Sequence, residues 1–335
     1  MKKNLRNILV LSLGLMTTVA TAQDWDVDSR TRIDKSGDND KNVTNQRATL
    51  GATWGGSDWG VHVSSDVNYM LGSGDASMGI YEAYASTDLM GYATVTMGRQ
   101  ALNNGSGALM SSNAWGATRT TWDGMTFDLG LDMADVSLGY ASYNGGAEGE
   151  EDQGNMWVNA AGEFSGWDVN MLYMTRTSSD DAATGIDISG ELMGAGISAS
   201  MNTDYDGNTM NAYGVSYAVN DDMSVNVGQT TYSEDAAFHM AGTNMDGSWM
   251  ETGSMGYLGA GDEDLSYGLT YNMAGVSLGA TMHKITNAAD ADGAESRDVT
   301  EVNLGYSLND NAGLGVKYAT DGDNKYTWLT LTIRP

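Results

Sequence analysis

Basic side chains are scarce in this chain, and their positions suggest a role in handling charged solutes. The 335 residues include 16 Lys and Arg against 44 Asp and Glu, which gives a formal net charge of −28 at pH 7. Arg30 and Arg32 stand two residues apart, a spacing that places both side chains on one face of an extended strand. Fixed charges on such a face concentrate ions of opposite sign. The basic residues in segments of this kind are Arg30, Arg32, Arg47, Arg99, Arg119, Lys317 and Arg334.

The residues that catalysis or metal binding would need are few and poorly spaced. The histidines His62, His239 and His283 have no zinc-ligand spacing, and the chain has no cysteine. The sequence TGSMG at 252–256 lacks the spacing of a nucleophile elbow. His239 with Asp235 is the best candidate for a hydrolase pair, but a solvated loop histidine explains it better. We therefore predict no enzyme activity, no catalytic residue, no cofactor and no metal.

Acidic residues gather in polar stretches between the apolar segments. Such a surface is a poor partner for nucleic acid, and at low salt it concentrates cations. Solubility and a saline habitat explain the same clusters equally well, and no cluster fits an EF-hand calcium loop. The clusters are Asp38 and Asp40; Glu148, Glu150, Glu151 and Asp152; Asp180 and Asp181; Asp204 and Asp206; Asp262, Glu263 and Asp264; Asp290, Asp292 and Glu295; Asp321 and Asp323.

The elements that must position these charges are strands, because apolar and polar residues alternate along most of the chain. The sequence DWGVHVSSDVNY at 58–69 and the sequence GWDVNMLYM at 166–174 are typical. Segments of this kind are about 9 to 12 residues long, which is enough to cross a bilayer as a tilted strand. No mature segment approaches the run of about 18 apolar residues that a transmembrane helix needs.

Short and long connections alternate between these segments, as in an up-and-down barrel whose hairpins are tight at one end only. The pattern predicts an all-β transmembrane antiparallel barrel of about 18 strands, with 16 as the alternative count. Residues 234–264 are either one long loop or a loop that hides a further hairpin. A bore this wide holds water, so the polar face lines it and the apolar face meets lipid. Aromatic girdles are expected from Trp25, Trp54, Trp59, Tyr69, Trp167, Tyr217 and Tyr232.

The first 22 residues have the three parts of a secretory signal peptide. Lys2, Lys3 and Arg6 precede an apolar run at 8–16, and small residues at 20–22 form a cleavage site before Gln23. We expect residues 1–22 to be removed and residues 23–335 to form the barrel. The leader carries no acidic residue, so the mature chain is more acidic still.

Residues 79–131 resemble the porins of Gram-negative bacteria. In that family a strand, a tight turn and a strand ending in GRQ precede a loop that folds back into the pore. Here residues 81–87, 89–91 and 92–99 match these parts, and GRQ stands at 98–100. The resemblance implies an outer-membrane protein in contact with lipid and lipopolysaccharide, a homotrimer, and a constriction loop at 101–117 after the fifth strand. The family carries acidic residues on this loop, whereas residues 101–117 contain none.

Alternation assigns each candidate pore residue to a face of the barrel wall. It turns Arg30, Arg32, Arg47 and Lys317 inward, and closure brings the last strands beside the first. It turns Arg99 and Arg119 outward, unless a bulge or the loop junction redirects them. Arginines near strand ends can instead snorkel or pair with nearby acids. On the loop, Asn113 and Trp115 are the constriction candidates.

These observations favour a porin that lets small hydrophilic solutes and ions diffuse passively, with a preference for cations. A substrate-selective channel for a sugar or another small solute is the first alternative. In that case we expect an aromatic residue inside the bore, and Trp115 on the folded loop is the candidate. A non-conducting barrel that serves as an adhesin or surface structural protein is the second.

Overall fold

The computed structural model describes residues 24–334, apart from 38–42, 143–152, 248 and 288–295. The expected leader at 1–22 and three of the acidic clusters, at 38–40, 148–152 and 290–295, lie outside the described residues. The first nine strands are β1 (Asp24–Asp34), β2 (Val43–Gly55), β3 (Trp59–Met70), β4 (Ala76–Leu89), β5 (Ala93–Gln100), β6 (Trp122–Gly130), β7 (Asp135–Ser142), β8 (Gly154–Phe164) and β9 (Trp167–Arg176). The others are β10 (Ala182–Leu192), β11 (Ala195–Thr203), β12 (Thr209–Ala218), β13 (Met223–Tyr232), β14 (Asp262–Met273), β15 (Val276–Asn287), β16 (Arg297–Asn309), β17 (Ala312–Asp321) and β18 (Asn324–Ile333).

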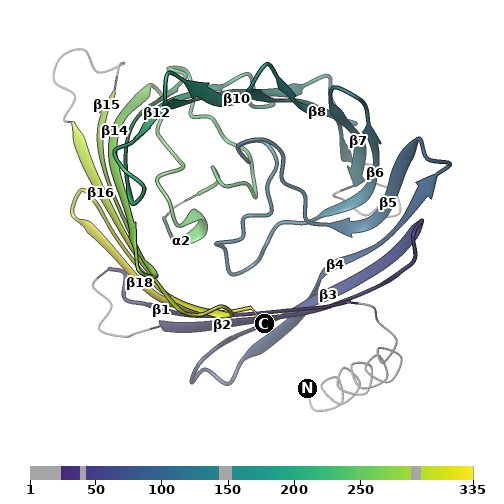
Figure 1. The fold of residues 1–335 in the computed structure, drawn as a ribbon, viewed down its shortest axis with the longest axis horizontal. Coiled ribbons are helices and arrows are strands. Elements are labelled where there is room, and N and C mark those ends of the chain that lie inside the picture. The colour runs from purple at the N-terminus through teal and green to yellow at the C-terminus, as the bar shows by residue number, and fades with distance from the viewer. Residues whose placement is uncertain (1–23, 38–42, 143–152, 248, 288–295, 335) are drawn as a thin grey trace.

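The strands form one closed antiparallel barrel, seen from its end in Figure 1. Each strand pairs with its sequence neighbours, and β1 pairs with both β2 and β18, so the sheet has no free edge. Closure matches Arg30 with Thr332 on one side and with Arg47 on the other. The predicted all-β barrel is confirmed, and the count is 18 rather than 16.

The apolar face of each strand points outward, as the alternation predicts. On β9, Met171 and Tyr173 are exposed on the outer surface, while Leu172 and Met174 between them are buried. Large apolar side chains that remain exposed in this way can be covered by lipid. Among the expected girdle residues, Trp25, Trp59, Tyr69 and Tyr217 are exposed. Tyr232 was wrongly assigned, because it is buried inside and packs on Phe238.

Four of the tight hairpins have two successive residues with positive φ. These pairs are Met90 with Gly91, Ser165 with Gly166, Met193 with Gly194, and Ala274 with Gly275. Two positive φ values in a row define the type I′ turn, whose twist matches that of the flanking strands. The glycine at the second position of each turn adopts a positive φ without strain, which explains why each turn closes in two residues.

Two connections fold into the barrel instead of projecting from it (Figure 1). Residues 101–121 follow β5, as the inward loop after the fifth strand was predicted to do. Residues 233–261 follow β13 and contain the one-turn helix α2 (Trp249–Thr252). In the described part of this stretch β14 follows at Asp262 with no strand before it, so residues 234–264 contain one long loop and no further hairpin. We call these segments loop A (101–121) and loop B (233–261).

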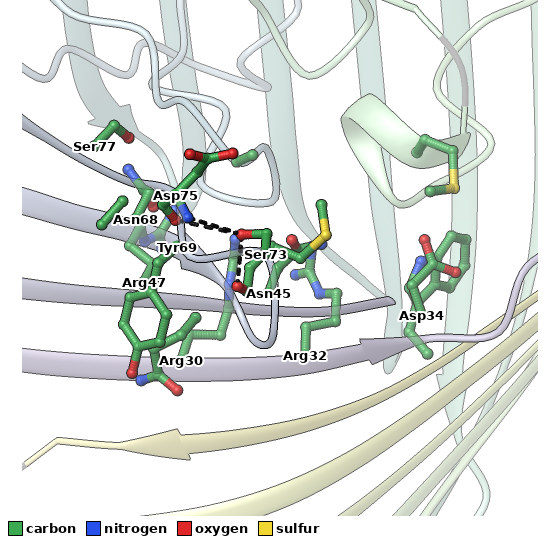
Figure 2. Close-up of a pocket in the computed structure, with 16 residues that line it drawn as sticks. Arg30, Arg32, Asp34, Asn45, Arg47, Asn68, Tyr69, Ser73, Asp75 and Ser77 are labelled. Carbon is green, nitrogen blue, oxygen red and sulfur yellow. Dashed lines mark hydrogen bonds between the residues drawn. The ribbon is translucent and has the colours of Figure 1, made fainter. Parts of the chain in front are cut away.

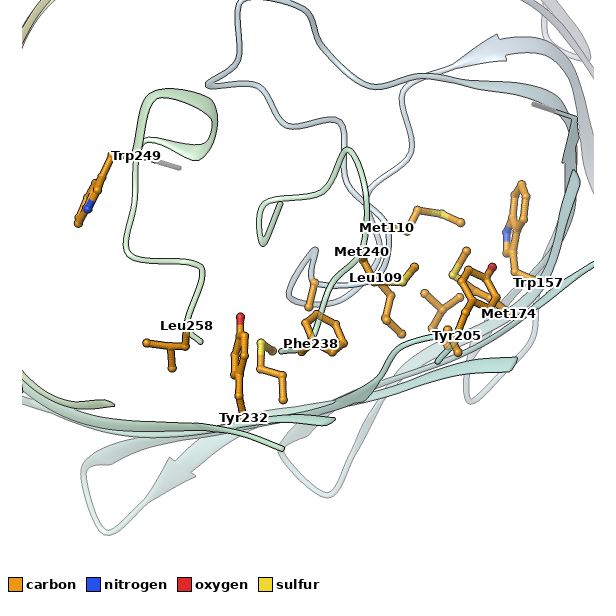
Figure 3. Close-up of a cluster of buried hydrophobic side chains, with 14 of the residues drawn as sticks. Leu109, Met110, Trp157, Met174, Tyr205, Tyr232, Phe238, Met240, Trp249 and Leu258 are labelled. Carbon is orange, nitrogen blue, oxygen red and sulfur yellow. The ribbon is translucent and has the colours of Figure 1, made fainter. Parts of the chain in front are cut away.

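An apolar cluster attaches both loops to the wall of β8 to β13 (Figure 3). Leu109 and Met110 of loop A and Phe238 and Met240 of loop B are its central members. The wall contributes Trp157, Leu172, Met174, Ala183, Met210 and Tyr232. The inward face of these strands is apolar where the loops cover it, and the covering loops remove these side chains from water.

Candidate pore constriction

Three arginines of the barrel wall donate hydrogen bonds to the tip of loop A. Arg30 on β1 reaches the carbonyl oxygens of Ala114 and Trp115 at 2.9 Å each and that of Gly116 at 3.1 Å. Arg32 reaches the Trp115 oxygen at 3.0 Å. Arg47 on β2 reaches the oxygens of Ala114 and Gly116 at 3.2 Å each. We call Arg30, Arg32 and Arg47 the arginine clamp.

The loop does not neutralise the positive charge of the clamp, because its carbonyl groups are dipoles and carry no net charge. Within the described residues, none of the three arginines forms an ion pair with a carboxylate. The Nε atoms of Arg32 and Arg47 are buried and have no hydrogen-bond acceptor. Arg32 also stacks over the Trp115 ring, with its guanidinium carbon 3.6 Å from the ring centroid.

Arg119 anchors the far end of loop A in a different way. Its guanidinium group pairs with the Asp66 carboxylate on β3, with Nε 3.0 Å from Oδ2, and Nη2 donates to Thr49 at 3.0 Å. The guanidinium carbon lies 3.2 Å from the centroid of the Tyr81 ring. Arg119 precedes β6, so the alternation that turned it outward does not apply, and its side chain is inside the barrel.

Trp115 and loop B meet beside the wall of β1 and β18. The Trp115 ring makes an edge contact with Trp328 of β18, at 5.3 Å between centroids. It also lies so close to Gly253 of loop B that a Cβ at that position would come within 2.1 Å of the ring. Hydrogen bonds from Thr120 to the Gly242 oxygen, 2.6 Å, and from the Asn244 amide to Ser111, 2.9 Å, join the two loops directly.

Carboxylates of β16 and β17 hold loop B. Glu301 accepts the Met255 amide at 3.1 Å and lies 3.0 Å from the Lys317 amine. Asp321 accepts the Trp249 indole N–H at 3.1 Å and the Tyr257 hydroxyl at 3.2 Å. Burial, and then the nearby Asp321 charge, raise the pKa of Tyr257 above its ordinary value, so this hydroxyl stays a donor.

A histidine between two carboxylates supports the same wall. His283 on β15 lies 2.7 Å from Asp264 through Nδ1 and 3.5 Å from Glu301 through Nε2. His239, by contrast, is exposed and faces Asp246 at 3.7 Å rather than Asp235. The described residues contain no group of three His, Cys, Asp or Glu side chains that could hold a metal ion.

Open space remains on both sides of the two loops. On the side of the long connections, a cavity of about 500 Å³ is lined by the clamp together with Asp34 and Asp75 (Figure 2). On the side of the short turns, a cavity of about 640 Å³ is lined by hydroxyl, amide and carboxylate groups of β7 to β12. Its acidic members are Asp135, Glu163, Asp168 and Asp187.

The structure therefore brings together most of the residues singled out in the sequence. Arg30, Arg32, Arg47, Arg119, Lys317 and Trp115 surround the junction of the two loops. Asn113 is buried beside it, with a left-handed φ of 42° and its carbonyl oxygen bonded to the Gly116 amide at 3.1 Å.

Arg99 does not belong to this group, and its inclusion among pore-lining residues is corrected. Thr94 and Gln100 of β5 line an interior cavity, so by alternation Arg99 is on the outer face. There it forms two 2.6 Å hydrogen bonds with Asp123 of β6. The alternation of side chains along the strand had predicted an outward Arg99, and the pairing of β5 with β4 and β6 contains no bulge that would turn it inward.

The residues that sequence reasoning missed are those of loop B, its anchors Glu301 and Asp321, and His283, which contacts Glu301. Glu301 sits at an inward position of β16, which alternation could have shown. Nothing in the sequence marks residues 233–261 as a second connection that folds inward.

Comparisons with known proteins agree on the fold. No family model matches the chain, and no curated protein matches its sequence. Among solved structures, OccK5 (OpdH) of Pseudomonas aeruginosa has a TM-score of 0.75 at 12% identity, over 94% of this chain and 99% of that one. OccAB3 of Acinetobacter baumannii has a TM-score of 0.73 at 10% identity, over 93% and 99%.

The outer membrane protein OprD of Pseudomonas aeruginosa has a TM-score of 0.68 at 11% identity, over 94% of each chain. The resemblance to outer-membrane porins is thereby confirmed at the level of the fold. No helix among the described residues is long and apolar enough to cross a bilayer.

Proposed function

We propose that this chain forms a water-filled channel in a bacterial outer membrane, through which small hydrophilic solutes and ions diffuse passively. The observation that carries the proposal is a closed barrel whose outer face is apolar and whose interior holds cavities, with charged and hydrogen-bonding residues in their lining, on both sides of two inward loops. Lipid covers the apolar band, and the loops set the largest solute that passes.

A preference for cations is the finer part of the proposal. Asp135, Glu163 and Asp168 line the cavity on the short-turn side, and none of them forms an ion pair within the described part of the chain. Their charges and the net charge of the chain concentrate cations. The arginine clamp opposes this locally, so the sign of the selectivity is a direct test of which set of charges dominates.

A substrate-selective channel is the second candidate, and the double constriction favours it. Two loops that meet at Trp115 leave a narrower path than one loop would. A track of exposed aromatic rings for sugars receives no support, because Trp249 and Trp328 are 0% and 1% exposed and both pack against Tyr326. Selection by this interior would depend on charge and hydrogen bonding.

Planar-bilayer recording of the refolded protein tests both candidates. Stepwise conductance with a reversal potential of the cation-selective sign in a KCl gradient is the expected result. Block of the current by one solute class at low concentration would select the second candidate. An absence of steps from protein shown to be folded would overturn the channel and leave the adhesin or structural barrel. An anion-selective reversal potential would overturn the cation preference alone.

Membrane partners complete the proposal. The exposed apolar band fits contact with lipid and lipopolysaccharide. On the basis of the resemblance to porins, we also propose that the chain forms a homotrimer. Chemical cross-linking in detergent, followed by gel analysis, is expected to give a trimer band; a monomer band at every cross-linker concentration would overturn that part.

A further inference from the structure

We infer that the arginine clamp positions loop A across the lumen, so that Arg30, Arg32 and Arg47 set the channel width mechanically as well as electrostatically. The inference rests on the proposed function, because width has meaning only for a conducting pore. It makes the three arginines positioning residues: they act on a solute through the loop that they hold.

The bonding pattern is the main argument. Six hydrogen bonds of 2.9 to 3.2 Å converge on the three consecutive carbonyl oxygens of residues 114–116. Every acceptor is a main-chain atom. Residues 101–117 contain no Asp or Glu, so the loop offers the arginines no carboxylate in competition with its backbone.

Guanidinium geometry explains why arginine occupies these sites. A guanidinium group carries five N–H donors in a rigid planar fork, whereas a lysine amine is a compact point charge. Arg30 uses this fork to reach three carbonyl oxygens at once. A lysine would keep the positive charge but could not hold the same three atoms.

The rest of loop A is anchored independently, which confines the effect to its tip. Leu109 and Met110 are buried in the apolar cluster, and Arg119 is paired with Asp66. Ala114 and Ala117 at the tip are exposed and add little packing of their own. Release of the clamp is therefore expected to move residues 113–118 and leave the base of the loop in place.

The test separates the charge of the clamp from its geometry. The double variant R30K/R47K keeps both charges and removes the forks that make five of the six hydrogen bonds. Arg176→Lys is the matched control, because Arg176 stacks on Tyr205 with 4.1 Å between its guanidinium carbon and the ring centroid and does not touch the loop tip. R30Q/R47Q removes the charge as well.

The first readout does not depend on conduction. The chain has no cysteine, so Ser112→Cys, at a buried position beside the tip, introduces a unique thiol. Its labelling by a small charged thiol reagent is expected to be at least about tenfold faster in R30K/R47K, the factor that corresponds to loss of one charged hydrogen bond. The rate in the Arg176→Lys background is expected to match that of the otherwise unchanged protein.

Single-channel recording is the second readout. R30K/R47K is expected to show larger and noisier current steps with an unchanged reversal potential. Labelling and step size equal to those of the unchanged protein would overturn the inference, as would a shift of reversal potential in R30Q/R47Q without faster labelling. If R30K/R47K fails to fold, Arg30→Lys alone, which breaks up to three bonds, takes its place. A protein that never conducts would refute the proposed function, whereas the labelling result would still decide whether the clamp holds the tip.

Discussion

Asp321 of β17 is the wall residue on which the docking of loop B is expected to depend most. Its carboxylate accepts the Trp249 indole N–H at 3.1 Å and the Tyr257 hydroxyl at 3.2 Å, and it lies 3.3 Å from Arg297. Asp321 and Trp249 are both buried, so water cannot readily replace the lost acceptor in an alanine variant.

The size of the effect follows from these two hydrogen bonds. A hydrogen bond to a charged acceptor contributes about 1.5 to 3 kcal/mol, so Asp321→Ala is expected to cost loop B about 3 to 6 kcal/mol of docking free energy. That loss corresponds to a rise of about 10² to 10⁴ in the undocked fraction. Asp321→Asn keeps one side-chain oxygen acceptor without the negative charge, and its effect is expected to be smaller.

Thiol labelling of loop B measures this fraction. Thr252→Cys introduces a single thiol at the buried last residue of α2. Its labelling rate is expected to rise in the order unchanged protein, Asp321→Asn, Asp321→Ala. Asp323→Ala, an exposed acid on the adjacent turn, is the matched control and is expected to have no effect. Equal rates for Asp321→Ala and Asp323→Ala, with both barrels folded, would refute the assignment of Asp321 as the anchor.

Three further changes test other parts of the structure. Asp66→Asn leaves the Arg119 charge buried without its partner and is expected to lower the free energy of unfolding by about 3 to 5 kcal/mol. The folded barrel is then expected to lose its fast mobility in detergent gels at a lower temperature. An unchanged temperature would contradict this. Gly98→Ala places a Cβ 2.2 Å from the Ala83 oxygen at a φ of 131°, so refolding yield is expected to fall, whereas Gly79→Ala meets nothing within 4 Å and serves as the control. Leu109→Ala opens a cavity where loop A meets the wall and is expected to cost about 2 to 5 kcal/mol, visible as faster amide exchange in residues 105–112 but not in the strands.

The amino-acid sequence by itself determined the architecture of the wall. Alternation with a period of two assigns each side chain to one face, and this rule placed Arg30, Arg32, Arg47 and Lys317 inside. The regular change between short and long connections determined that the strands run up and down around a closed sheet. Both signals are local, because they depend on neighbours two residues apart or on a turn of a few residues.

The same rule is least informative where the wall is covered. Leu172 and Met174 of β9 are as apolar as the outward-facing Met171 and Tyr173, yet they point inward. The strand as a whole is therefore apolar on both faces, and only the loops that pack against it explain why. Arg119 shows the other limit, since alternation has no meaning for a residue outside a strand.

Only the tertiary structure decided how the interior is filled. Nothing in residues 233–261 marks this connection as the second one to fold inward, because the Glu301 and Asp321 that hold it come from strands far along the chain. The partners of the arginine clamp are equally hidden, since they are carbonyl oxygens that every residue carries. A side chain that binds main-chain atoms leaves no complementary residue type in the sequence, so its partner is identified only when the folded barrel brings the two together.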